Sequence, residues 1–153
     1  MRKKALILYA SWTGNTKIVA RSIAAGLKKK GVEAKVENIK KTILKEIKSH
    51  NILAIGSATH GGKTLRSVKS LFEKIPKGAL KGKIGVSFAV QAGWGGDKVI
   101  KKIKEYFLEK GMEKVEPGPI ISAGIPFLPV RRPTEDDLKK CERFGEKLVE
   151  EKL

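Results

Sequence analysis

The sequence predicts a doubly wound α/β fold, in which helices cover both faces of a parallel β-sheet. Apolar runs of strand length alternate with stretches of helical periodicity from one end of the chain to the other. The connections between them are short, and the chain holds no repeat and no low-complexity tract. We expect its 153 residues to form one domain, residues 1–153, that buries a core without disulfide support.

The first strand is expected at the apolar run of residues 5–10. The helix after it carries apolar and small residues at helical spacing from Lys17 onward, and a lysine cluster followed by Gly31 is a typical helix end. Residues 32–38 alternate between apolar and polar side chains, which predicts a strand with one covered face.

A short helix around residues 42–48 is expected to lead to residues 51–57. That run is apolar on both faces, as a central parallel strand would be. Residues 64–75 carry an apolar stripe at helical spacing, and Pro76 ends the helix that they predict. The next strand is expected at residues 83–90.

In the last third, apolar residues at 99–107 predict a helix, and residues 116–124 a final strand with an extension over residues 126–129. The last helix is expected to begin with Thr134 as its N-cap, because three acidic residues follow it directly. Its apolar stripe includes Cys141, which we expect to be a buried structural thiol rather than a redox group.

The composition is strongly basic, with 33 Lys and Arg against 16 Asp and Glu and a formal net charge of +17. Such a field attracts nucleic acid, anionic membranes or acidic proteins. Lysine-rich surfaces also occur in proteins from hot environments, so the charge alone names no partner. One cysteine excludes an internal disulfide framework, and no run has the length of a transmembrane helix. We therefore expect a soluble cytoplasmic protein.

The least ordinary stretch, residues 11–16, reads Ser-Trp-Thr-Gly-Asn-Thr and joins the first strand to the first helix. The N–H groups and positive dipole end of a helix N-terminus favour a phosphate there. Three hydroxyls and the Asn15 amide can donate to it, and Gly14 allows a close approach or a positive φ. The six residues include no charged side chain, so hydrogen bonds rather than an ion pair would hold the phosphate. The alternative is an ordinary N-capped turn, because Ser, Thr and Asn are common capping residues.

This stretch resembles, at every position, the Ser/Thr-x-Thr-Gly-Asn-Thr loop with which flavodoxins hold the phosphate of flavin mononucleotide (FMN). The resemblance implies a five-stranded parallel sheet of order 2-1-3-4-5 with FMN as the cofactor. Ligands of doubly wound sheets bind beyond the carboxyl ends of the strands at the switch point. In this order the loops after strands one, three and four meet there.

The second and third of these loops, residues 57–63 and 91–97, each contain a glycine pair that lets the backbone approach a flat ligand. Trp94 lies between glycines, where it can stack on the isoalloxazine with Trp12 nearby, or simply pack beneath its loop. His60 can reach the ring or cap the next helix. The residues expected to contact FMN are Ser11, Trp12, Thr13, Gly14, Asn15 and Thr16, then Ala58, Thr59, His60, Gly61 and Gly62, then Gln91, Ala92, Gly93, Trp94, Gly95 and Gly96.

The Gly93-Trp94-Gly95-Gly96 loop, a helix and then Pro133-Thr134-Glu135-Asp136-Asp137 together resemble the flavodoxin domain of flavodiiron proteins, here expected to be free-standing. The chain lacks the His/Asp/Glu clusters of a diiron domain, so we expect no metal and no reduction of oxygen or nitric oxide. In that family an aromatic often precedes the Gly-Trp pair. Here the residue is Ala92, which leaves one face of the ring less covered.

The resemblance implies an electron carrier that shuttles electrons between redox proteins through its flavin and needs no catalytic residue. One alternative is a small FMN-dependent NAD(P)H or quinone reductase, although short loops offer little material for a second pocket. Another is a basic nucleic-acid-binding protein, although the basic residues lack interleaved aromatics for base stacking.

The charge near the expected site differs from that of familiar flavodoxins, which are acidic around the flavin. Lys17, Lys63 and Lys98 flank the three loops and reverse the expected sign. Such a field favours acidic redox partners, ferredoxin-like proteins or a reductase.

Overall fold

The computed structural model describes residues 3–124 and 131–153. Its strands form one parallel five-stranded sheet with strand order β2-β1-β3-β4-β5. This confirms the predicted fold class and strand order. The strands are β1 (Lys4–Ala10), β2 (Glu33–Asn38), β3 (Ile52–Ala58), β4 (Ile84–Gln91) and β5 (Lys114–Ser122). The helices are α1 (Asn15–Lys29), α2 (Leu44–Ser49), α3 (Arg66–Lys74), α4 (Gly96–Glu109) and α5 (Glu135–Lys152), with a 3-10 turn, η1 (Ile39–Lys41).

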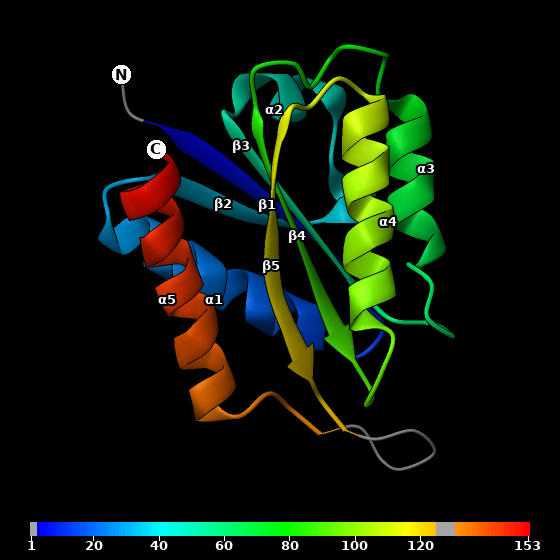
Figure 1. Cartoon of the computed structure of the whole chain (residues 1–153), viewed down its shortest axis with the longest axis vertical. Helices are drawn as coiled ribbons and strands as arrows, with labels where there is room; N and C mark the ends of the chain where they lie inside the picture. The colour runs from blue at the N-terminus through cyan, green and yellow to red at the C-terminus, as the bar shows by residue number, and fades with distance from the viewer. Residues whose placement is uncertain (1–2, 125–130) are drawn as a thin grey trace.

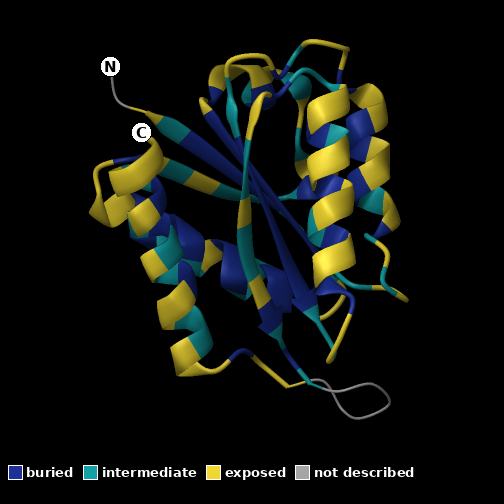
Figure 2. Cartoon of the chain, in the orientation of Figure 1, coloured by how far each residue is buried: buried dark blue, intermediate teal, exposed yellow. Residues whose placement is uncertain are grey.

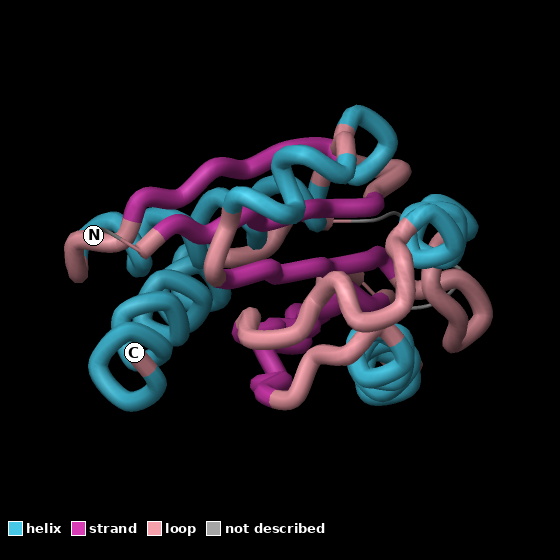
Figure 3. The backbone as a smooth tube through the Cα atoms, turned by 90° about the horizontal axis from the view of Figure 1, so that it is seen from above, coloured by secondary structure: helices cyan, strands magenta, loops and turns pink. Residues whose placement is uncertain are grey.

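Helices cover both faces of the sheet, with α1 and α5 on one side and α3 and α4 on the other (Figures 1 and 3). Alternate side chains of β1 therefore enter different cores. Leu6 and Leu8 pack in the cluster that includes α3 and α4, whereas Ala5 and Ile7 pack in the cluster that includes α1 and α5. The central strands are buried and the outer helix faces are exposed (Figure 2), which explains why the central strands read as continuous apolar runs.

The helices α1 and α5 touch through their backbones because a glycine lies at each side of the contact. A Cβ at Gly26 would lie 1.9 Å from the carbonyl oxygen of Glu142, and one at Gly145 would lie 2.4 Å from that of Ile23. No side chain fits at either position without moving a helix. Both helices begin toward the end of the sheet where the loops of interest lie (Figure 1).

The last strand is irregular for a reason visible in its sequence. Pro117 and Pro119 have no N–H to donate, and the register between β4 and β5 shifts between Ser87 and Ala89. A Cβ at Gly118 would lie 2.7 Å from the carbonyl oxygen of Ser87, so the glycine allows the strands to meet there. The extension predicted over residues 126–129 lies outside the described residues.

The start of α5 and the state of its cysteine are as predicted. Thr134 and Asp137 form a reciprocal capping box, in which each side chain accepts from the backbone N–H of the other. Cys141 is a free cysteine with no exposed surface. Burial, with the nearby Asp137 carboxylate, raises the pKa of its thiol to about 12, so it stays protonated and unreactive at neutral pH.

Candidate cofactor site

Three loops meet beyond the carboxyl ends of β1, β3 and β4, where the sequence places the site. The indole of Trp12 and the imidazole of His60 lie edge to face with ring centroids 4.8 Å apart, which joins the first loop to the second. A Cβ at Gly95 would lie only 3.0 Å from the Cα of Gly62, so the second and third loops meet backbone to backbone. The topology therefore brings together all three predicted loops.

The first loop holds its own hydroxyl groups in place. Ser11 Oγ accepts from the N–H of Gly14 at 2.9 Å, and Thr13 Oγ1 accepts from the N–H of Asn15 at 3.3 Å. A hydroxyl that accepts a hydrogen bond keeps its own proton to donate. Gly14 caps α1 in the left-handed region, at φ 88°, without a side-chain cap. Both hydroxyls thus remain available as donors to an anion.

The side chain of Thr16 is the strongest indication that this loop binds a ligand. Its side chain has no exposed surface, and its Oγ1 atom has no hydrogen-bond partner among the residues that the structure describes. Buried hydroxyls in folded proteins are rarely left unpaired. Because the hydroxyl lies in the first turn of a 15-residue helix, an acceptor-only anion such as the FMN phosphate suits the donors present. The loop residues therefore fit the phosphate.

Asn15 is buried, and its amide contacts a distant segment that the sequence did not connect with the loop. The Asn15 Nδ2 atom donates to the carbonyl of Arg131 at 3.0 Å, and its Oδ1 accepts from Arg132 Nη1 at 2.9 Å. Arg132 Nη1 also donates to the carbonyl of Thr13 at 2.6 Å. A guanidinium thus lies on the loop for which the sequence predicted no charged group. The only signal was an unexplained basic pair before the Pro-Thr start of the last helix.

The third loop is held by Gln91 at the end of β4. Its Oε1 accepts from the N–H of Gly96 at 2.9 Å, and its Nε2 donates to Ser122 Oγ at 2.9 Å. The side chain therefore spans its own loop and the end of β5. The N–H of Thr59 donates to the carbonyl of Val90 at 3.0 Å, which anchors the second loop to the same strand end.

The two tryptophans lie on the loop surfaces rather than in the core, with 68% of Trp12 and 50% of Trp94 exposed. Trp94 lies beside Lys98, whose Nζ atom is 5.7 Å from the ring centroid. Such exposed aromatic surface suits a ligand or a partner. The half-buried Ala58 and Ala92 and the exposed Gly61 and Gly93 complete the loops.

His60 does not cap α3. The N-cap of that helix is Leu65, whose N–H donates a hydrogen bond of 3.0 Å to the Oγ atom of Ser57, near the end of β3. The backbone N–H and C=O of His60 instead pair with those of Lys63 in a turn. Its imidazole is left to pack on Trp12, at the edge of the predicted site.

A cleft of about 410 Å³ opens beside Trp12, between α3 and the segment that follows β2. It shares Ser11 and Trp12 with the predicted site but none of the third loop. Its rim carries the basic side chains of Lys40, Arg66 and Lys74. This end of the molecule is therefore hollowed and basic on one flank of the first loop.

Within residues 3–124 and 131–153, no group of His, Cys, Asp and Glu side chains is placed to hold a metal ion. In the same described ranges, no helix combines the length and apolarity that crossing a membrane requires.

Comparison with known proteins agrees with the geometry. The sequence matches the Flavodoxin family over residues 7–145. An uncharacterized protein of Methanocaldococcus jannaschii is 32% identical over 97% of this chain, which spans 37% of the length of that relative.

Two solved structures show the same fold. A flavodoxin from the domain Archaea is 31% identical, with a TM-score of 0.80 and coverage of 96% of both chains. A flavodiiron core from Synechocystis sp. is 24% identical, with a TM-score of 0.74, and the match covers 97% of this chain and 35% of that one. The second likeness shows the fold alone. Since the family match spans all three loops and nearly the whole sheet, this chain belongs to the flavodoxin family, whose members bind FMN and transfer electrons to redox proteins.

Proposed function

We propose that this chain is an electron carrier that holds FMN at the carboxyl ends of β1, β3 and β4. The observation that carries the proposal is the buried Thr16 hydroxyl at the start of α1, which has no hydrogen-bond partner in the described part of the chain and which a phosphate would satisfy. The bound flavin supplies one- and two-electron chemistry, and the chain supplies binding, orientation and charge.

Each loop has a separate task in this proposal. Ser11, Thr13 and Thr16 donate to the phosphate, and the first turn of α1 adds its N–H groups. The glycines of the second and third loops bring main-chain donors and acceptors to the edge of the ring. Trp94 covers part of the ring and limits the access of water, which favours electron transfer over side reactions.

The partners that suit this surface are acidic redox proteins. Lys17 is half-buried, Lys63 and Lys98 are exposed, and all three flank the loops. Asp97, in the first turn of α4, is the acidic residue within the three loops. The resulting positive field steers an acidic partner toward the flavin and weakens as salt rises.

The test begins with the visible absorption spectra of two samples, the freshly purified protein and the apoprotein reconstituted with FMN. We expect a flavin spectrum, tight FMN binding and reversible reduction. We also expect negligible steady-state oxidation of NAD(P)H unless a reductase is added, because the flavin of an electron carrier exchanges electrons with protein partners rather than with a nicotinamide. Absence of FMN binding would refute the proposal, and rapid NAD(P)H turnover by the chain alone would identify a reductase instead.

A further inference from the structure

We infer that Arg132 is a binding residue for the cofactor phosphate, so that this phosphate site contains a permanent positive charge supplied from outside the loop. The inference rests on the proposed FMN site and adds a residue that the loop sequence does not contain. It also replaces the expectation that hydrogen bonds alone would hold the phosphate.

The first support is the position of the guanidinium. Arg132 Nη1 contacts the first loop at two points, the carbonyl of Thr13 and the amide oxygen of Asn15. The same atom would lie 3.4 Å from a Cβ at Gly14, which places it in contact with the residue that caps α1. A positive charge therefore lies against the turn whose N–H groups would face the phosphate.

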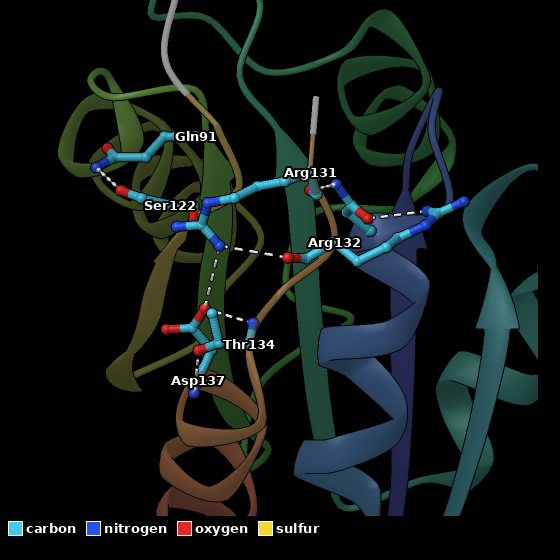
Figure 4. A network of polar contacts seen from close by, with 7 residues as sticks. Gln91, Ser122, Arg131, Arg132, Thr134 and Asp137 are labelled. Carbon is cyan, nitrogen blue, oxygen red and sulfur yellow. Dashed lines mark hydrogen bonds and ion pairs between the residues drawn. The ribbon is translucent and has the colours of Figure 1, made fainter. Parts of the chain in front are cut away.

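The second support is that the segment carrying Arg132 is held on both sides. Arg131 and Arg132 point in opposite directions in Figure 4. Arg131 Nη2 donates to the carbonyl of Ser122 at 2.8 Å, and its Nη1 lies 3.9 Å from Asp137 Oδ2. The carbonyl of Arg131 accepts from Asn15. The strand end, the start of α5 and the first loop thus fix the backbone from which Arg132 extends.

The third support is the chemistry left unused on Arg132. Both of its recorded side-chain hydrogen bonds come from Nη1, and Nε and Nη2 have no recorded partner within the described parts of the chain. A guanidinium presents five donors in a planar fork that matches a phosphate. The contacts of Nη1 with Thr13 and Asn15 already restrict the side-chain conformation, so little further conformational entropy is lost when Nε and Nη2 bind a ligand.

The buried Thr16 hydroxyl is the second, independent sign of an anion at this place. Together, a donor-only guanidinium and a hydroxyl that has no acceptor among the residues the structure describes favour a dianionic ligand over a neutral one. FMN and riboflavin differ by this phosphate alone, and inorganic phosphate presents the same group without the ring. Comparing these three ligands therefore isolates the role of Arg132.

The experiment uses the full chain with Arg132→Gln, the charge-retaining Arg132→Lys, and Arg21→Gln as the control. Arg21 is an exposed arginine on α1, so the control removes the same charge away from the loop. The affinities of the apoproteins for FMN and riboflavin are measured at two salt concentrations. The melting temperature of each is measured with and without millimolar inorganic phosphate.

We expect Arg132→Gln to weaken FMN binding at least tenfold and to change riboflavin affinity less than threefold. We expect Arg132→Lys to lie between, and Arg21→Gln to match the wild type. The salt dependence of FMN binding and the rise in melting temperature with phosphate should both shrink in Arg132→Gln.

If Arg132→Gln lost equal affinity for FMN and riboflavin, Arg132 would only stabilise the loop and the inference would be overturned. Unchanged FMN affinity in this variant would overturn it as well. If the wild type bound no flavin, the proposed function would fail separately. The inference about an anion would then rest on the phosphate measurement, where equal stabilisation of wild type and Arg132→Gln overturns it.

Discussion

The indole of Trp94 lies against Gly62, so that a Cβ at Gly62 would be only 3.1 Å from Trp94 Cζ3. The contact joins the third loop to the second and sets the position of an aromatic ring that remains half exposed. Gly62 has φ 75°, a conformation that other residues rarely adopt. The backbone of one loop therefore shapes the aromatic surface of the other.

We predict that Trp94→Ala weakens the binding of FMN and riboflavin alike, roughly 5- to 150-fold, because stacking on an indole contributes about 1–3 kcal/mol per base-like ring. Trp94→Phe should retain most of the affinity. Fluorescence titration of each apoprotein measures both affinities, and the difference in quenching between the wild type and Trp94→Ala, which keeps Trp12, reports the contact of Trp94 with the flavin. Equal quenching in the wild type and Trp94→Ala, with unaltered affinity in the variant, would show that the indole of Trp94 lies away from the ring.

We predict that Thr13→Asp weakens FMN binding by more than tenfold through repulsion of the phosphate, while riboflavin binding changes little. The fold should tolerate the change, since Thr13 Oγ1 already accepts from the N–H of Asn15 and an aspartate is well suited to the start of a helix. Thr13→Asn, of similar shape and no charge, is the control. If FMN bound equally well to the aspartate variant, the phosphate would have to lie elsewhere.

The basic surface should make the second reduction of the flavin easier, because that electron produces an anion. One charge about 6 Å from the ring gives roughly 3 kcal/mol at an effective dielectric near 20, and solvent screening reduces this several-fold. We therefore predict that replacing Lys17, Lys63 and Lys98 together by Gln makes the second potential more negative by roughly 50 mV. Potentiometric titration measures the shift.

The same triple variant should slow electron exchange with an acidic partner and flatten its dependence on ionic strength. Replacing Lys28, Lys77 and Lys81, which are exposed and lie toward the other end of the sheet, provides the control with equal charge. A wild-type rate that is indifferent to salt, with potentials equal in both variants, would assign the charge to stability or to an unrelated partner.

The buried thiol predicts a loss of stability at alkaline pH. Because the pKa of Cys141 is raised from 9.0 to about 12 in the folded chain, the unfolded state loses this proton first as the pH rises. The stabilisation by the neutral thiol is complete below about pH 9 and falls by about 1.4 kcal/mol per pH unit above it, until the folded thiol titrates. Urea unfolding at pH 8 to 10.5 should show a shallower decline for Cys141→Ala than for the wild type. Parallel declines would mean that the thiol is not protected.

The contact between α1 and α5 predicts that Gly145→Ala lowers stability, although helix propensity alone would raise it. Gly145→Ala should gain up to about 1 kcal/mol if propensity decided the outcome. We expect a loss of about 1–3 kcal/mol or more instead, because the added methyl would overlap the backbone of Ile23 and Leu27. Lys28→Ala, on the exposed face of α1, serves as the control in the same denaturation series.

Local patterns in the sequence were enough to predict the strands, most helix ends, the Thr134 cap and the burial of Cys141. These features depend on neighbours within a turn or a strand, which the sequence lists in order. Some element boundaries differ from those predicted. The first helix begins at Asn15 rather than near Lys17, and η1 was not predicted, since the ends of helices and short turns depend on backbone geometry that side-chain periodicity does not report.

The sequence by itself determined the fold class, the flavodoxin family and the three loops that meet at one edge of the sheet. Only the tertiary structure decided that Arg132 rests on Thr13, 119 positions away, and that His60 packs on Trp12 rather than capping α3. The physical reason is that periodicity reports which face of an element is buried, whereas contacts between loops depend on how the close packing of α1 on α5 and the parallel register bring distant segments together.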